Sequence, residues 1–156
     1  MPKLEELYLA NNVITSLSGW ENLPALKKLH LRKNKIEKVE EELPPLDGLT
    51  YLNLRGNKIP NMEQLQRLFQ FAALVDINVL SCPIERQASS FNLLLAEVLI
   101  INPRIKRFCK TAVTDANLYE AVYLARYRWE KSEEERIRKE EEERAKENIG
   151  GADDDN

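Results

Sequence analysis

A repeated nine-residue pattern constrains this chain more than any other feature. The segments LEELYLANN (4–12), LKKLHLRKN (26–34) and LTYLNLRGN (49–57) each fit L-x-x-L-x-L-x-x-N, and an isoleucine follows each asparagine two residues later. The asparagines lie 22 and 23 residues apart. A fourth segment, LVDINVLSC (74–82), keeps the apolar places and has Cys82 in place of the asparagine. Such a period predicts a solenoid, in which each repeat is one coil that buries its apolar face against its neighbours.

The central L-x-L of each repeat predicts a short strand. Side chains alternate along a strand, so Leu7 and Leu9 enter the core while the residue between them points outward. The asparagine lies where the chain bends, and its amide can satisfy buried backbone groups that would otherwise cost roughly 1–3 kcal/mol each. These features are those of leucine-rich repeats. The expected fold is α/β: a leucine-rich-repeat solenoid with a short parallel sheet on its concave face, a helical C-terminal cap and a long charged C-terminal helix.

The segments that return the chain from one strand to the next are residues 16–25, 38–48 and 62–73. We expect short turns of helix or 3₁₀ helix in all three, with the second broken by Pro44-Pro45 and the third the most helical. The pattern begins at Leu4 with no polar cap before it, so an apolar edge stays open. Either further repeats precede it, which we favour, or another chain covers it.

A cap is predicted after the fourth repeat. Residues 89–108 begin with Ser89 and Ser90, either of which can cap a helix. Apolar side chains then follow at helical spacing until Asn102-Pro103 breaks the helix. Ile105 and Phe108 can fold back onto the last coil. We therefore expect one domain over residues 1–112, made of the repeats and this cap.

The period changes again beyond residue 112. Leu118, Val122, Ala125 and Trp129 form an apolar stripe, and from Lys131 onward the sequence is mostly charged. We expect an extended charged helix over 113–148 and a disordered tail over 149–156. In three pairs a glutamate precedes a basic residue by four positions, and each such ion pair would stabilise the helix by about 0.3–0.5 kcal/mol. These pairs are Glu134 with Arg138, Glu135 with Lys139, and Glu140 with Arg144.

Charge and composition exclude some classes of function. The net charge is −3, which favours neither a nucleic-acid partner nor a membrane surface. The longest apolar run, 93–101, is broken by Glu97 and is too short to span a bilayer. Two cysteines are too few for a disulfide framework, and the start lacks a signal-peptide pattern. We expect a soluble intracellular protein.

Catalytic and metal-binding motifs are missing from the sequence. His30 is the only histidine, and it lies on the outward face of a strand with no acid or nucleophile in a recognisable motif. Cys82 and Cys109 are isolated, so we interpret both as structural thiols rather than zinc ligands. The sequence contains neither of the glycine-rich phosphate-binding motifs G-x-x-x-x-G-K-[ST] and G-x-G-x-x-G. We therefore predict that the chain is not an enzyme and has no cofactor and no metal.

The outward strand positions are the first candidate binding surface. They carry aromatic, amide and basic side chains, and residues 27–38 have a local charge of +5. Arginines on neighbouring coils suit a partner with carboxylates. The alternative is a basic face that only contacts solvent. The candidate residues are Tyr8, Lys28, His30, Arg32, Tyr51, Asn53, Arg55 and Asn78.

Aromatic residues on the charged helix are the second candidate. Tyr119, Tyr123 and Trp129 either dock against the cap or form an exposed stripe that anchors a second protein. The charged segment past Lys131 has no apolar face of its own, so it is either a solvated strut or a contact with another protein.

The order of these features resembles one family. PKLEELYLANN, LKKLHLRKNKI and LTYLNLRGNKI, a degenerate last coil and a Glu/Arg-rich helix look like the C-terminal half of the leucine-rich-repeat protein of the ciliary radial spoke, at the third spoke of motile cilia. The likeness covers residues 2–110. Family members carry further repeats upstream, and VLSCPIE stands where a V-L-L-D-N-P-type sequence is the family pattern.

That resemblance implies a non-catalytic axonemal scaffold, located in the cytoskeleton of the cilium or flagellum. The implied partners are other axonemal and radial-spoke proteins, in a hetero-complex rather than a homo-oligomer, with no nucleic acid and no membrane. A paralogue in another axonemal complex fits the same features. Two other functions stay open: a regulatory binding subunit associated with dynein or a phosphatase, and a scaffold associated with nucleic acid.

Overall fold

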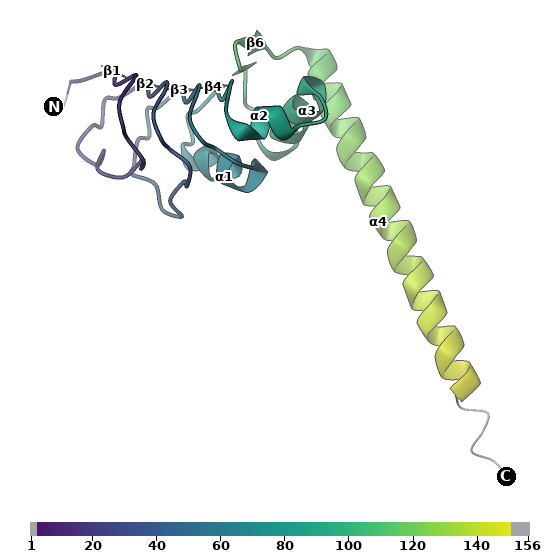
Figure 1. Cartoon of the computed structure of the whole chain (residues 1–156). Helices are drawn as coiled ribbons and strands as arrows, with labels where there is room; N and C mark the ends of the chain where they lie inside the picture. The colour runs from purple at the N-terminus through teal and green to yellow at the C-terminus, as the bar shows by residue number, and fades with distance from the viewer. Residues whose placement is uncertain (1–2, 151–156) are drawn as a thin grey trace. The chain divides into compact units, whose positions relative to one another are not determined.

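The computed structural model describes residues 3–150, and it describes side chains for residues 3–147. These residues fall into two compact units, one through Ala121 and one from Val122 onward. The division lies inside the last helix, whereas the sequence analysis placed it after residue 112. The first unit holds a six-stranded sheet with the order β1-β2-β3-β4-β5-β6 (Figure 1).

Four short parallel strands, one from each repeat, form most of this sheet. They pair in sequence order and in matched register, so Leu7 lies beside Leu29, Leu29 beside Leu52, and Leu52 beside Ile77. Each strand has three residues: β1 (Glu6–Tyr8), β2 (Lys28–His30), β3 (Tyr51–Asn53) and β4 (Asp76–Asn78). The predicted strands and their parallel stacking are confirmed. We call the repeats that hold them coils 1 to 4.

The apolar positions of the repeats form the core. Leu29 is 1% exposed, and Leu31 and Ile36 of the same coil are fully buried. The equivalent residues of coils 3 and 4 are also fully buried: Leu52, Leu54, Ile59, Ile77 and Val79. At about 25 cal/mol per Å² of apolar surface, this continuous row is the main stabilising term of the solenoid.

The repeat asparagines of coils 2 and 3 connect neighbouring coils as predicted, whereas Asn12 contacts Leu9 and Ala10 of its own coil. Nδ2 of Asn34 donates to the carbonyl oxygens of Leu9 and Leu31 at 2.9 Å, and its Oδ1 accepts from the N–H of Ile14 at 3.0 Å. Asn34 is 6% exposed, so the backbone groups that it satisfies have little access to water. In coil 4 the thiol of Cys82 keeps one of these contacts, since Sγ donates to the Leu54 carbonyl oxygen at 3.3 Å.

The residue before each asparagine or Cys82 has a left-handed backbone. The φ angles are 59° at Asn11, 56° at Lys33, 71° at Gly56 and 61° at Ser81. Each coil therefore turns sharply at the same place, three residues after the end of its strand. For residues other than glycine this conformation costs roughly 1–2 kcal/mol, which the stacked coils offset.

The return segments differ from the prediction in the first two coils. Residues 16–25 and 38–48 contain no helix. Gly19 has a φ of 89°, and Pro44-Pro45 has no N–H to donate, so neither segment continues a helical turn. Side chains of the following coil satisfy their backbone groups instead. Gln64 accepts from the N–H of Val39 at 2.7 Å.

Coil 3 returns through a helix, as predicted. It consists of α1 (Met62–Arg67) and the 3₁₀ helix η1 (Leu68–Gln70). Asn61 caps α1, because its Oδ1 accepts from the N–H of Gln64 at 3.1 Å. Leu65 and Leu68 are fully buried and add to the core.

The cap begins directly after coil 4 with α2 (Pro83–Gln87) and α3 (Phe91–Ile101). Ser90 caps α3 through a bond from the N–H of Leu93 to Oγ at 3.1 Å, which decides between the two predicted serines. The chain then folds back as predicted: β5 (Arg107–Phe108) pairs with β4 in parallel, and Phe108 is fully buried. The antiparallel β6 (Thr111–Ala112), which closes the sheet, was not predicted.

The last helix, α4 (Asp115–Gly150), begins and ends two residues after the predicted helix of 113–148. Thr114 and Asn117 fix its start, since Oγ1 of Thr114 donates to Oδ1 of Asn117 at 2.9 Å and accepts from its N–H at 3.4 Å. Of the predicted tail 149–156, residues 151–156 lie outside the described residues.

The ion pairs along α4 are not the three that the sequence predicted. Arg138 pairs with Glu142 rather than with Glu134, which pairs with Lys131. Further pairs join Arg126 with Glu130, and Arg136 with Glu133 and Glu140. From Lys131 onward each basic residue has at least two acids at i±3 and i±4. An exposed pair contributes less than about 1 kcal/mol, so spacing alone does not select the partner.

Candidate protein-binding surface

The outward side chains of the strands form two rows across the sheet. The register aligns Tyr8, His30, Asn53 and Asn78 in one row, as predicted. The second row starts nearer the beginning of the strands and contains Glu6, Lys28, Tyr51, Asp76 and Arg107. These rows place most of the predicted concave-face residues together on one surface.

Three aromatic rings stack across coils 1 to 3. The rings of Tyr8 and His30 lie 4.1 Å apart between centroids at an interplanar angle of 14°, and those of His30 and Tyr51 lie 4.8 Å apart at 41°. Tyr8 is 65% exposed, whereas His30 and Tyr51 are half-buried. We call Tyr8, His30 and Tyr51 the aromatic row. Stacked rings that are open on one side suit a protein interface, where aromatic side chains contribute much of the binding energy.

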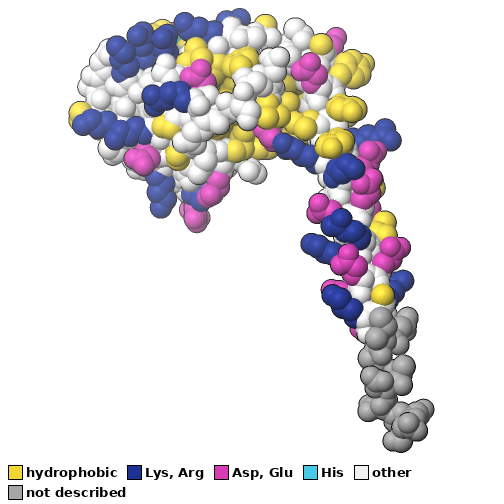
Figure 2. All heavy atoms as spheres, turned by 45° about the vertical axis from the view of Figure 1, so that its right-hand side comes forward, with side chains coloured by type: hydrophobic (Ala, Val, Ile, Leu, Met, Phe, Trp, Pro, Cys, Tyr) yellow, Lys and Arg dark blue, Asp and Glu magenta, His cyan; other side chains and the backbone are white. Residues whose placement is uncertain are grey.

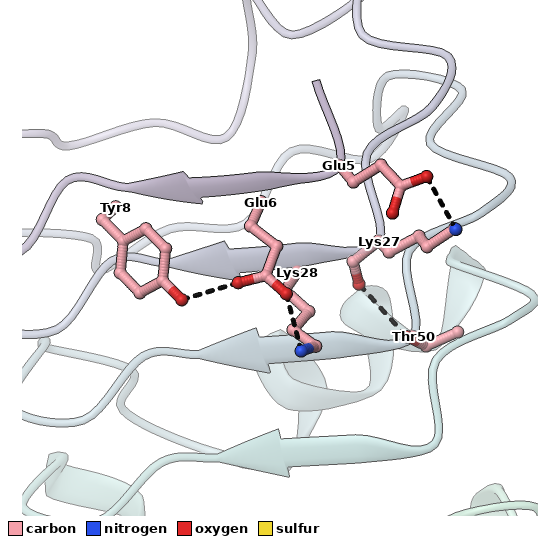
Figure 3. A network of polar contacts seen from close by, with 6 residues as sticks. All are labelled: Glu5, Glu6, Tyr8, Lys27, Lys28 and Thr50. Carbon is pink, nitrogen blue, oxygen red and sulfur yellow. Dashed lines mark hydrogen bonds and ion pairs between the residues drawn. The ribbon is translucent and has the colours of Figure 1, made fainter. Parts of the chain in front are cut away.

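A polar network lies beside the aromatic row (Figure 3). The carboxylate of Glu6 accepts from the hydroxyl of Tyr8 at 2.6 Å and pairs with Nζ of Lys28 at 2.7 Å. Both contacts lower the pKa of the Glu6 carboxyl, with Lys28 the larger cause. Next to them, Lys27 pairs with Glu5 at 2.9 Å. The predicted site residue Lys28 is therefore already neutralised within the chain.

Burial lowers the pKa of His30 below its ordinary value of 6.5. The rings on either side exclude water from the imidazole, and the charge of Lys28 acts in the same direction. The charge of Glu6 opposes this effect. Nε2 is buried without a hydrogen-bond partner among the described residues. His30 is thus mainly the neutral middle ring of the stack at pH 7.

A shallow hollow of about 280 Å³ continues the surface beyond Tyr51. Asp76 and Arg107, an ion pair at 3.6 Å, line it together with Lys110. The sequence analysis did not select Arg107. Its position one residue before Phe108 was the available signal, since alternation along a strand turns it outward once Phe108 enters the core.

Asn53 and Asn78 have mainly local roles. In each, Oδ1 accepts from the backbone N–H two residues later, from Arg55 at 3.1 Å and from Leu80 at 3.0 Å. Asn78 is only 2% exposed, because β5 and its turn continue the sheet beside it. It therefore offers little surface to a partner, unlike the other predicted residues of this face.

Arg32 and Arg55 lie just past the strands, in neighbouring coils. The backbone joins them, since the N–H of Lys33 donates to the Arg55 carbonyl oxygen at 2.8 Å. Neither guanidinium has a carboxylate within ion-pairing distance in residues 3–147. In Figure 2, Lys and Arg side chains gather at the upper left of the repeat unit, whereas acids and bases alternate along α4.

The candidate aromatic residues of α4 are open to solvent. Tyr119 is 77% exposed, Tyr123 is 73% exposed and Trp129 is 66% exposed. Ala121 on the same helix is buried, so the aromatic side chains are not the ones that α4 buries. Exposed aromatic residues at this spacing remain candidates for contact with a second protein.

The chemistry of metals and thiols is limited in the part of the chain that the structure describes. No three His, Cys, Asp or Glu side chains there lie close enough together to hold a metal ion. Cys82 and Cys109 are both buried and free, and burial raises the pKa of Cys109 to about 12. Both thiols are thus held in their unreactive, neutral form at pH 7. None of the described helices is long and apolar enough to cross a membrane.

Comparisons with known proteins agree with this geometry. The family described as "Leucine Rich repeats (2 copies)" matches residues 2–48, which hold coils 1 and 2. A chain in the crystal structure of the Drosophila melanogaster SNF/U2A' complex superimposes with a TM-score of 0.69, over 78% of this chain and 68% of that one. The chain has the leucine-rich-repeat fold. At 21% sequence identity, the structural likeness establishes the fold alone.

Relatives in sequence are leucine-rich proteins too. Over 127 residues the chain is 32% identical to human leucine-rich repeat-containing protein 23, covering 81% of this chain and 36% of that protein. Over 76 residues it is 43% identical to the acidic leucine-rich nuclear phosphoprotein 32 family member A of Drosophila melanogaster. That match covers 49% of this chain and 29% of the Drosophila protein. The chain therefore spans about a third of the length of these curated relatives. Leucine-rich-repeat folds are typically non-enzymatic interaction scaffolds, and no catalytic family is indicated.

Proposed function

We propose that this chain is a non-catalytic protein-binding scaffold of the ciliary axoneme and a structural component of its radial spoke. The observation that carries the binding role is the aromatic row, a stack of rings left open on the outward face of the sheet. Other spoke proteins would contact this row together with Arg32, Arg55 and the exposed part of Asn53. Tyr119, Tyr123 and Trp129 on α4 would provide a second contact.

Two further observations support the axonemal part of the proposal. The repeat segments and the charged helix resemble the leucine-rich-repeat protein of the radial spoke, and the chain is similar to leucine-rich repeat-containing protein 23 in human and cow. The length and charge of α4 also suit an extended element of a large assembly, because its segment past Lys131 has no apolar face of its own.

The test is incorporation of the tagged chain into cilia. We expect it to remain in axonemes after a high-salt wash and to co-purify with radial-spoke proteins by mass spectrometry. Tyr8→Ala should weaken this retention, whereas Val13→Ala, which changes an equally exposed residue outside the aromatic row, should not. Absence of the wild-type chain from washed axonemes would rule out the axonemal role.

A regulatory binding subunit, associated with dynein or a phosphatase, is the second candidate function. Its support is the pair Arg32 and Arg55, which have no acidic partner among residues 3–147 and lie where a soluble partner can reach them. In that case the chain would co-purify with such an enzyme from the salt-soluble fraction, without spoke proteins. The same purification thus separates the two candidates.

A further inference from the structure

Basic side chains at the two ends of the strands differ in their surroundings. At the beginning of β2, Lys27 pairs with Glu5 and Lys28 pairs with Glu6. Past the ends of β2 and β3, five basic side chains have no carboxylate within ion-pairing distance in the described part of the chain. We call these five the basic edge: Arg32, Lys33, Lys35, Arg55 and Lys58.

The stacking of coils 2 and 3 brings the basic edge together. Arg32 and Arg55 occupy equivalent positions two residues before the repeat asparagine, and Lys35 and Lys58 occupy equivalent positions one residue after it. Neighbouring strands lie about 4.8 Å apart, so equivalent residues are close neighbours. Lys33 lies against Gly56 of the next coil, since its Cγ would be 3.3 Å from a Cβ placed on Gly56.

Acidic residues are missing from all four turns at this edge. None occurs in residues 9–15, 31–36, 53–60 or 78–84, and Glu37 directly follows the second of these turns. Glu85, which follows the last of these turns, already accepts from the N–H of Ser81 at 2.7 Å. Like charges at such short distances repel one another, so the basic edge costs folding free energy unless an external anion neutralises it.

We propose that the basic edge binds an acidic segment of a partner protein, a peptide rich in glutamate or aspartate. This inference rests on the proposed function and names the chemistry of the partner that the scaffold would hold. Arg32 and Arg55 each present a planar fork of N–H donors that matches a carboxylate, and Lys33, Lys35 and Lys58 add point charges around them.

A protein fits this edge better than a nucleic acid does. The basic edge spans only two coils, and the ion pairs of Glu5 and Glu6 lie at the opposite end of the strands. The whole chain has a net charge of −3 and a pI near 5.4. Domains that bind nucleic acid through phosphate contacts usually have a pI above about 9.

The test is binding of a labelled peptide of about ten glutamates to the full chain, measured by fluorescence anisotropy at about 50 mM salt, where screening is weak. Arg32→Gln with Arg55→Gln should weaken binding about tenfold. Lys27→Gln with Lys28→Gln removes the same charge from side chains that already have partners, so it should weaken binding less than about threefold. Circular dichroism confirms that both double variants remain folded.

Three outcomes would overturn the inference: no peptide binding by the wild-type chain at low salt, equal weakening by the two double variants, or tighter binding of a single-stranded RNA of the same charge. None of these depends on cilia. A chain that binds the peptide through Arg32 and Arg55 but is absent from axonemes would contradict the proposed axonemal role and leave the acidic-peptide site intact.

Discussion

The side chain of Asn57 donates a hydrogen bond of 2.8 Å from Nδ2 to the carbonyl oxygen of Leu31, one coil earlier in the chain. The same nitrogen donates to the Leu54 carbonyl oxygen at 2.8 Å, and Oδ1 accepts from the N–H of Ile36 at 3.1 Å. One amide therefore satisfies three buried backbone groups in two coils. It holds the two turns that carry the basic edge in a fixed relation.

Asn57→Ala should destabilise the protein by at least about 3 kcal/mol. Three backbone groups would lose their partner, and each unsatisfied buried group costs roughly 1–3 kcal/mol. Urea unfolding followed by circular dichroism measures the change in the free energy of unfolding. Asn12→Ala is the control, because Asn12 is exposed and its contacts with Leu9 and Ala10 are open to water. A loss at Asn57 no larger than the loss at Asn12 would contradict the idea that the three hydrogen bonds of Asn57 stabilise the fold.

Gly56→Ala should destabilise the protein by about 1–2 kcal/mol. Gly56 has a φ of 71°, which strains any residue with a Cβ, and the new Cβ would lie 3.3 Å from Cγ of Lys33. The matched control is Gly48→Ala, because Gly48 does not have a positive φ and its Cβ would lie 3.4 Å from the Leu26 carbonyl oxygen. The midpoints of urea unfolding should separate the two variants. Equal midpoints would show that the left-handed turn is not the cause.

Much of the fold follows from the repeated pattern, because that pattern fixes what each residue contacts. In the L-x-L segments, alternation sends Leu29 and Leu52 inward and His30 outward, and the equal spacing of the coils places equivalent residues side by side. The neighbourhood of Tyr8 and His30 was therefore predictable, whereas the register places Tyr51 beside Lys28 rather than beside His30. The ring distances were not predictable, since they depend on the side-chain rotamers that the Glu6 network selects.

Other features depend on contacts between distant segments that carry no periodic signal. The return segments of coils 1 and 2 lack helices because side chains such as Gln64, 25 residues further along the chain, satisfy their backbone. The burial of Asn78 follows from the addition of β5 to the sheet. The partner of Arg138 on α4 depends on small differences among several available acids, which sequence spacing cannot rank.

The buried thiol of Cys109 should make the protein less stable at alkaline pH. Its pKa is raised from 9.0 to about 12 in the folded state, first by desolvation. A raised pKa of this kind contributes stability below pH 9, and that stability is lost progressively as the pH rises from 9 towards 12, since the unfolded chain ionises first. At pH 10 the loss should be about 1 kcal/mol.

Urea unfolding of the wild type and of Cys109→Ala at pH 8 and pH 10 isolates this contribution. Other groups that titrate in this range, such as Tyr51, are present in both proteins and cancel in the difference. The stability of the variant should therefore fall less steeply with pH. Identical slopes would mean that the thiol does not carry the effect.

His30 allows a direct measurement of the aromatic row, because it is the only histidine in the chain. The Cε1–H resonance of this one imidazole therefore reports its titration by NMR without overlap from a second histidine. We expect a midpoint below 6.5, since desolvation between Tyr8 and Tyr51 disfavours the charged ring. Because the pKa of His30 is lower in the folded state than in the unfolded state, its contribution to stability is present above pH 6.5. That contribution is lost as the pH falls from 6.5 through the folded-state pKa.

Tyr8→Ala should raise the midpoint of His30 towards its ordinary value, because water regains access to one face of the imidazole. Tyr8→Phe is the matched control. It keeps the stacked ring and removes only the hydroxyl that donates to Glu6, so the midpoint should stay low. If the two variants shift the midpoint equally, the network around Glu6 rather than the stacked ring sets the pKa of His30. If neither shifts it, Tyr8 does not cover the imidazole in solution, and the aromatic row is not the preformed surface that the proposed scaffold requires.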